Sequence, residues 1–106
     1  IRVRSIIGRL LEHSRVFYFA VDGVETMWLS SADWMNRNMM RRIEIAWPIV
    51  DAKNRARLLK ECCQVYLDDN QDAWILNADG TYSAASVNAQ EIKHSAQQQL
   101  IKHYAD

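Results

Sequence analysis

Apolar and polar positions follow different periods along the chain, and each period predicts a different kind of element. Spacings of three and four residues relate the apolar side chains of the first segment, which are Val3, Ile6, Ile7, Leu10 and Leu11. This pattern is typical of an amphipathic helix, here over residues 2–12, with His13 just beyond its end. Gly8 costs about 1 kcal/mol relative to Ala inside a helix, so we expect a close neighbour there.

Two β-rich runs follow, over residues 15–21 and 26–31, with Asp22 and Gly23 between them. Such runs around an Asp-Gly pair predict a β-hairpin, here with a loop longer than two residues. Both runs are apolar on each face, as Phe17 and Tyr18 illustrate, so we expect a sheet covered on both sides. Residues 34–40 are predicted to be irregular or to form a short helical turn.

The second half of the chain adds further elements. Residues 42–47 alternate between polar and apolar and stop at Pro48, which predicts a strand. Asp51 is a suitable N-cap for a helix that runs to about Leu67. A short strand over residues 73–77 and a turn at 79–80 come next. Asn88, with Glu91 three residues on, resembles a capping box and predicts a last helix from there to about residue 104.

The predicted fold class is therefore α/β, with a mixed sheet of about four strands packed against three helices. The chain has 106 residues, which fits a single domain over residues 1–106. Its apolar content of 49%, with three Gly and one Pro, excludes a disordered or collagen-like chain. No uncharged apolar run approaches the roughly 20 residues of a transmembrane segment. The chain starts at Ile1 without a Met, so we expect a piece of a longer protein.

Cys62 and Cys63 are adjacent within a helical pattern, where a disulfide between them would be strained. We interpret them as two thiols in a reducing compartment, with intermolecular pairing as the alternative. Charged residues interrupt the first fifteen positions, so no signal peptide is predicted. Both observations point to the cytoplasm.

The net charge of zero hides an asymmetry. Residues 1–60 hold nine Arg and two Lys against six acidic residues, whereas residues 61–106 hold two Lys against seven acidic residues. Arginine is suited to two-point binding of phosphate or carboxylate oxygens, so the first half suggests an anionic ligand. Solvated arginines at strand edges are the alternative interpretation.

Three polar clusters are candidates for chemistry. His13 and Arg15 could bind a phosphoryl group, with His13 also transferring a proton, or they could be a helix cap and a strand-edge charge. The second cluster follows a strand end and holds Ser31, Asp33, Arg37 and Asn38; its alternative is an ordinary polar turn. The third is Arg42, either a phosphate contact or an ion partner of Glu44. The sequence has no glycine-rich phosphate loop, Cys/His metal spacing or nucleophile elbow.

Residues 1–15, 29–38 and 42–44 together resemble the C-terminal catalytic domain of bacterial polyphosphate kinase. This resemblance implies a fold similar to one half of phospholipase D. It also implies an enzyme that reversibly transfers the terminal phosphoryl group of ATP to inorganic polyphosphate, through a phosphohistidine and with Mg²⁺. It further implies ATP/ADP and polyphosphate as ligands and no binding of nucleic acid. The expected location is the cytoplasm, where peripheral association with the membrane is an option. Whether the protein forms a homo-oligomer is left open.

The resemblance assigns roles residue by residue. His13 corresponds to the histidine that assists the leaving group, and Arg42 to an arginine that contacts phosphate. By looser analogy with phospholipase D, Arg15 stands in place of the motif lysine, and Ser31 and Asp33 near its downstream polar residues. The nucleophilic histidine and the magnesium ligands belong to a preceding catalytic domain, so no metal ligand is expected in this chain.

The chain is therefore expected to hold only half of the active site. We predict that the chain alone neither forms phosphohistidine nor hydrolyses ATP. A non-catalytic module that binds anions or nucleic acid through the basic half is the alternative function. A purely structural oligomerisation segment is a third possibility.

Overall fold

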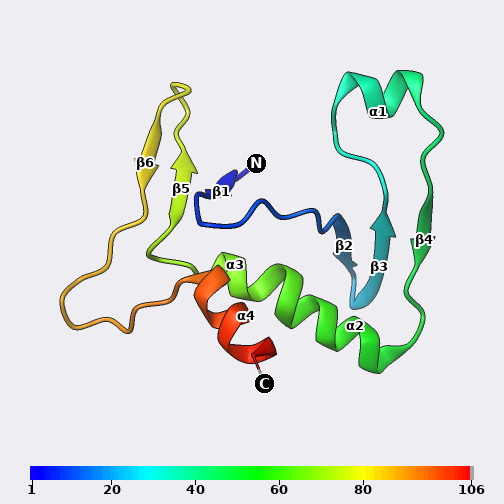
Figure 1. Cartoon of the computed structure of the whole chain (residues 1–106). Helices are drawn as coiled ribbons and strands as arrows, with labels where there is room; N and C mark the ends of the chain where they lie inside the picture. Colours follow the sequence, from blue (N-terminus) through cyan, green and yellow to red (C-terminus); the bar gives the residue numbers. More distant parts are fainter. Residues whose placement is uncertain (106) are drawn as a thin grey trace. The chain divides into compact units, whose positions relative to one another are not determined.

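The computed structural model describes residues 1–105 and confirms the α/β class. Within those residues, six strands form two three-stranded antiparallel sheets in place of one sheet of about four strands, and there are three helical regions (Figure 1). The chain divides into two compact units, which are His13–Cys62 and the combination of Ile1–Glu12 with the chain from Cys63 onward. No helix in the described part of the chain has both the length and the apolar character needed to cross a membrane.

The sheet of the unit His13–Cys62 contains β2 (Val16–Val21), β3 (Val24–Ser30) and β4 (Ala46–Pro48), in the order β2-β3-β4. The predicted hairpin is confirmed, but its loop is shorter than expected, since Val21 pairs directly with Val24. Asp22 and Gly23 have φ values of 50° and 78°. Two such residues form the tight turn that matches the twist of paired strands.

The two faces of this sheet differ in burial. Tyr18 pairs with Met27, which is 2% exposed, and both line a small hollow together with Ala56 and Leu59 of the following helix. On the opposite face Phe19 is 55% exposed and Trp28 is 38% exposed. The expectation of a sheet covered on both sides is therefore wrong for the described residues, because this unit supplies a helix to one face only.

The helical predictions for residues 34–67 are largely confirmed. The short helical turn is α1 (Asn36–Arg41), and Asp51 caps α2 (Ala52–Leu58) by accepting a hydrogen bond from the backbone N–H of Asn54 at 2.8 Å. The helix continues through a π-helical segment, η1 (Leu59–Gln64), and α3 (Val65–Leu67). The strand predicted over 42–47 is shorter, because its pairing with β3 begins only at Ala46.

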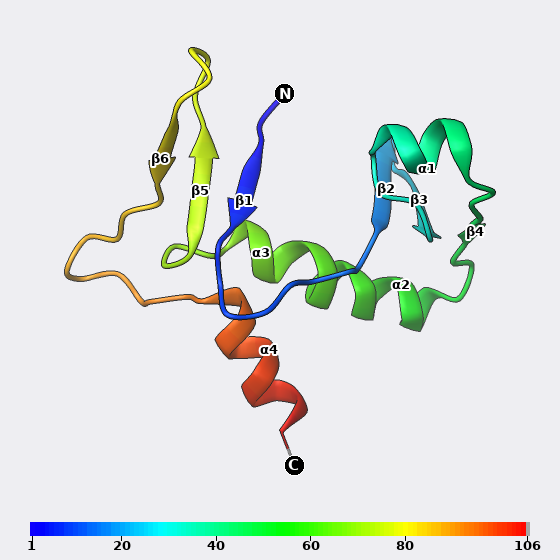
Figure 2. The ribbon, with the colours of Figure 1, turned by 45° about the horizontal axis from the view of Figure 1, so that its top comes forward.

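The sheet of the other unit contains β1 (Arg4–Ile6), β5 (Ala73–Leu76) and β6 (Tyr82–Ala84), in the order β1-β5-β6 (Figure 2). The helix predicted over residues 2–12 is wrong, because Arg4 pairs with Ile75 in an antiparallel ladder. The expected close neighbour of Gly8 is confirmed: a Cβ there would lie 2.3 Å from Oε1 of Gln97.

The last helix, α4 (Ala96–Tyr104), begins well after the predicted start at Asn88. The Asn88 N–H does contact Glu91 Oε2 at 3.4 Å, but this contact closes only a local turn. The helix starts instead where the buried carboxylate of Asp69 accepts a hydrogen bond from the Ala96 N–H at 2.7 Å. A carboxylate from a distant position thus replaces the predicted local cap.

Candidate functional site

The candidate site lies in the unit His13–Cys62, where β2 begins and β3 ends. Arg15 immediately precedes β2, and its backbone carbonyl accepts a hydrogen bond from Ser30, the last residue of β3, at 3.1 Å. Strand pairing therefore brings the predicted His13 and Arg15 cluster beside the predicted polar segment that follows β3. Polar loops at strand ends are common places for ligand binding.

Arg15 and Asp33 form the ion pair of this site. Nε of Arg15 donates to Oδ1 of Asp33 at 2.8 Å, and the two side chains are 28% and 38% exposed. This hydrogen bond lowers the pKa of Asp33, against the opposing effect of desolvation, and raises the pKa of Arg15. The pair therefore stays ionised, and it fixes the direction of the Arg15 guanidinium.

The charges of Arg37 and His13 also lower the pKa of Asp33. Such an effect decays with distance, so both residues lie in the electrostatic neighbourhood of that carboxylate. Both are solvent-exposed.

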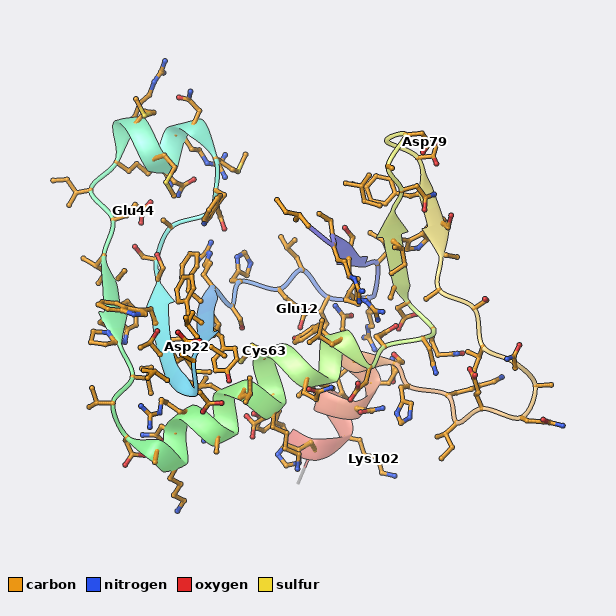
Figure 3. The ribbon with its side chains drawn as sticks, turned by 180° about the vertical axis from the view of Figure 1, so that it is seen from behind. Glu12, Asp22, Glu44, Cys63, Asp79 and Lys102 are labelled. Carbon is orange, nitrogen blue, oxygen red and sulfur yellow. The ribbon has the colours of Figure 1, made fainter. Side chains whose placement is uncertain are left out.

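Glu44 connects two other predicted residues. Its carboxylate accepts a hydrogen bond from the Ser31 hydroxyl, and its Oε1 accepts from Nδ2 of Asn38 at 2.8 Å. These hydrogen bonds lower the pKa of Glu44, and the charges of Arg42 and Arg15 lower it further, while desolvation opposes them. In Figure 3 the Glu44 side chain lies between the segment that leads into β4 and the segment that leaves β3.

Arg42 is exposed, and within residues 1–105 it forms no ion pair with Glu44 at hydrogen-bonding distance. The alternative interpretation, in which Arg42 serves only as the ion partner of Glu44, is therefore wrong for the described residues. Its charge acts on Glu44 over a longer distance, and its guanidinium stays open to solvent. An exposed guanidinium near a strand end is available to an anionic ligand.

One expectation about these residues needs correction. His13 does not follow a helix, because residues 8–15 contain no helix, so the interpretation of His13 as a C-terminal helix cap is wrong. Asn38 lies in the predicted helical turn, α1, and is only 4% exposed. Its Oδ1 has no hydrogen-bond partner among the described atoms.

Sequence reasoning missed the central place of Glu44. It noted this residue only as a neighbour of Arg42 on the polar face of a strand. A usable signal exists, because Glu44 is the one acidic residue between Asp33 and Asp51, in a stretch that carries Arg37, Arg41 and Arg42. Its hydrogen bonds to Ser31 and Asn38 depend on the closure of a long loop, which spacing alone does not reveal.

The residues present do not form a metal site. Across the described chain, no group of three or more His, Cys, Asp or Glu side chains could hold a metal ion. The two carboxylates of the candidate site already accept hydrogen bonds, Asp33 from Arg15 and Glu44 from Ser31 and Asn38.

Comparison with known proteins gives one consistent family. Residues 1–97 match the family model described as polyphosphate kinase C-terminal domain 2. The polyphosphate kinase of Burkholderia ambifaria (strain MC40-6) is 54% identical over 82 residues, which are 77% of this chain and 12% of that protein. The polyphosphate kinase of Xylella fastidiosa (strain Temecula1) is 45% identical over 102 residues, which are 96% of this chain and 15% of that protein.

A solved structure agrees with these matches. The crystal structure of polyphosphate kinase from Porphyromonas gingivalis aligns with 96% of this chain at a TM-score of 0.85 and 32% sequence identity. The aligned region is 15% of that longer chain. The chain thus spans less than a sixth of the relatives that it matches.

Proposed function

We propose, since the chain belongs to the polyphosphate kinase C-terminal domain 2 family, that it forms part of the active site of a polyphosphate kinase. The enzyme would reversibly transfer the terminal phosphoryl group of ATP to inorganic polyphosphate. The nucleophilic histidine, which would carry the phosphoryl group as phosphohistidine, and the ligands of Mg²⁺ would come from a preceding catalytic domain. Residues 1–106 would then act as one contributing segment, in the cytoplasm or at its membrane face.

The observation that carries this proposal is the grouping of cationic side chains around Asp33 and Glu44. Arg15 is bonded to Asp33, and the charges of Arg37 and His13 act on the same carboxylate. Arg42 acts on Glu44 from a solvent-exposed position. Phosphoryl transfer depends mainly on positioning and on charge stabilisation, and both are properties of such a cluster.

Each residue has a proposed role. Arg42 and Arg37 are exposed and would bind phosphoryl oxygens, for which the planar guanidinium is well suited. His13 would contact the transferred phosphoryl group without bonding to it covalently and would exchange a proton with the leaving oxygen, because an imidazole can change protonation state near neutral pH. Arg15, held by Asp33, would add a fixed positive charge at the same place.

Ser31, Asp33 and Asn38 are also predicted to belong to the phosphate site. Their observed hydrogen bonds, to Glu44 and Arg15, support a role in holding the cationic residues in place. Direct contact of these three with ATP or polyphosphate stays a prediction. A carboxylate such as Asp33 repels phosphate, so its contribution would act through Arg15.

Alanine substitutions in a full-length polyphosphate kinase that carries this sequence test the proposal. We expect His13→Ala and Arg42→Ala each to reduce polyphosphate synthesis by about 10²–10³-fold, as loss of one charge-stabilising contact does in other enzymes. The matched control is Arg57→Ala, since Arg57 lies on α2 and pairs with Glu61 away from the site. The melting temperature of each variant shows whether the fold survives.

Near-normal synthesis by His13→Ala would contradict the role of the imidazole. Competition binding addresses the alternative function. A kinase should prefer ATP and polyphosphate to single-stranded DNA, whereas a general anion-binding module should bind all three through its basic half with similar salt dependence.

A further inference from the structure

One loop carries two of the proposed phosphate-binding arginines. We call residues 31–45 the α1 arm, because they leave the end of β3, form α1 and return to β4 (Figure 1). Two hydrogen bonds close the base of this arm. The Ser31 N–H donates to the Ile45 carbonyl at 3.0 Å, and the Ile45 N–H donates to Oγ of Ser31 at 3.0 Å.

Beyond its first residues, where Ala32 is buried and Asp33 pairs with Arg15, the α1 arm has few contacts that hold its shape. Helix α1 has six residues, and no side chain caps its N-terminus at Met35. Isolated helices of this length are unstable in water. The large apolar side chains of the arm are also exposed, with Trp34 at 82%, Met40 at 76% and Ile43 at 100%. Hydrophobic packing within the described chain therefore contributes little to the position of α1.

Asn38 is the buried polar anchor of α1. Its side chain is held by the hydrogen bond from Nδ2 to Glu44 Oε1, since its Oδ1 has no partner among the described atoms. The same Glu44 carboxylate accepts from Ser31 at the base of the arm. One side chain thus connects the base of the arm to its helix, and its pKa is lowered, so it stays ionised and keeps both acceptor oxygens.

We infer that Glu44 is a positioning residue of the phosphate site, which holds the α1 arm so that Arg37 and Arg42 keep a fixed geometry toward the phosphoryl group. Arg37 directly precedes Asn38, and Arg42 lies two residues before Glu44. Loss of the Glu44 hydrogen bonds would therefore release both guanidinium groups together. This inference rests on the proposed function.

The test uses Glu44→Ala and Glu44→Gln in a full-length polyphosphate kinase that carries this sequence. We expect Glu44→Ala to reduce kcat/KM for ATP by about 10²-fold, as a small misplacement of reacting groups does. Glu44→Gln keeps an acceptor for Asn38 and can donate to the Ser31 hydroxyl, so we expect it to retain most of the lost activity. The matched control is Asp79→Asn, which alters another carboxylate that accepts side-chain and backbone hydrogen bonds, here from Thr81 in the other unit.

A mutant cycle in the Arg37→Ala/Arg42→Ala background separates positioning from general destabilisation. If Glu44 acts through these two guanidinium groups, adding Glu44→Ala to that variant should reduce kcat/KM by less than about 10-fold more. An undiminished 10²-fold effect in that background would overturn the inference, as would wild-type activity of Glu44→Ala. If Arg42→Ala and His13→Ala are themselves fully active, the proposed function fails. If they are impaired and Glu44→Ala is not, the positioning role alone fails.

Discussion

The guanidinium of Arg15 donates a 2.8 Å hydrogen bond to the carboxylate of Asp33, joining the residue before β2 to the loop after β3. This ion pair is half-exposed, so its contribution to stability is small, as for most surface pairs. Its consequence is orientation, because the bonded guanidinium has one direction while the free side chain would have many rotamers. A fixed cation beside His13 and Arg37 is the arrangement expected of a phosphate site.

The Arg15–Asp33 pair predicts a specific pH dependence. The pKa of Asp33 is lowered from its ordinary value of 3.8, chiefly by the hydrogen bond from Arg15. The folded state therefore favours the charged carboxylate, so its stabilising effect is present at neutral pH and is lost as the pH falls through the lowered pKa. We expect Asp33→Asn to be less stable than wild type at neutral pH and to converge with it in acid.

Urea unfolding at a series of pH values measures this difference. Asp22→Asn is the control, since it removes a carboxylate of the same unit that forms no ion pair in the described structure. A constant gap between Asp33→Asn and wild type down to the most acidic pH would show that the charge of Asp33 is not responsible.

The isolated 106-residue chain is predicted to be catalytically silent. It carries His13 and the arginines, but the proposed nucleophile lies outside it. We therefore expect no incorporation of label from radiolabelled ATP into the chain and no release of phosphate above background. Mixing with the remaining domains of a polyphosphate kinase is the informative control. Acid-labile labelling of the chain alone would contradict the division of the site.

The buried Asp69 carboxylate predicts a large effect on stability. Asp69 is 1% exposed, and its two oxygens accept hydrogen bonds from four backbone N–H groups, those of Gln71, Asp72, Ala73 and Ala96, at 2.7–3.0 Å. Asp69→Asn would replace one of the two acceptor oxygens with an NH₂ group. This group cannot accept a hydrogen bond from the backbone N–H groups that it would face. We expect a loss of about 2–4 kcal/mol in the free energy of unfolding, measured by urea denaturation.

The adjacent Asp68 offers a matched control, because it is exposed and accepts from the Gln64 side chain on the helix surface. Asp68→Asn should change the unfolding free energy by less than about 0.5 kcal/mol. Equal effects of the two substitutions would mean that the Asp69 hydrogen bonds contribute nothing particular.

Gly8 is predicted to tolerate no side chain. A Cβ at this position would lie 2.3 Å from Oε1 of Gln97, which is 3% exposed. Gln97 has little freedom to move, since it accepts from the Leu10 N–H at 2.9 Å and donates to the Leu10 carbonyl at 2.8 Å. We expect Gly8→Ala to cost about 1–3 kcal/mol, as overpacking does.

A thermal unfolding cycle of Gly8→Ala, Gln97→Ala and the double variant checks the cause. Removal of the Gln97 side chain should relieve the clash, so the double variant should be more stable than the sum of the single effects predicts. Strict additivity would show that the cost of Gly8→Ala has another origin.

Two features that depend only on neighbouring residues were correctly predicted from sequence. Asp51 caps α2 because an N-cap needs only the N–H groups of the next turn, and the hairpin at Asp22–Gly23 forms because these residues adopt positive φ. The polar segment after β3 and the basic residues near it were also identified, since residue type and order are enough to find them.

Partners far apart in the chain were decided by tertiary structure alone. The spacing of Ile6 and Ile7 fits a helix, yet residues 4–6 form a strand because β5 supplies a pairing ladder about seventy residues later. Helix α4 likewise begins at Ala96 because Asp69, 27 residues earlier, caps it. Glu44 reaches Ser31 and Asn38 only once the α1 arm has closed. Local patterns specify what each segment can form, whereas long-range hydrogen bonds select among those forms, because they alone satisfy polar groups that the segment cannot satisfy within itself.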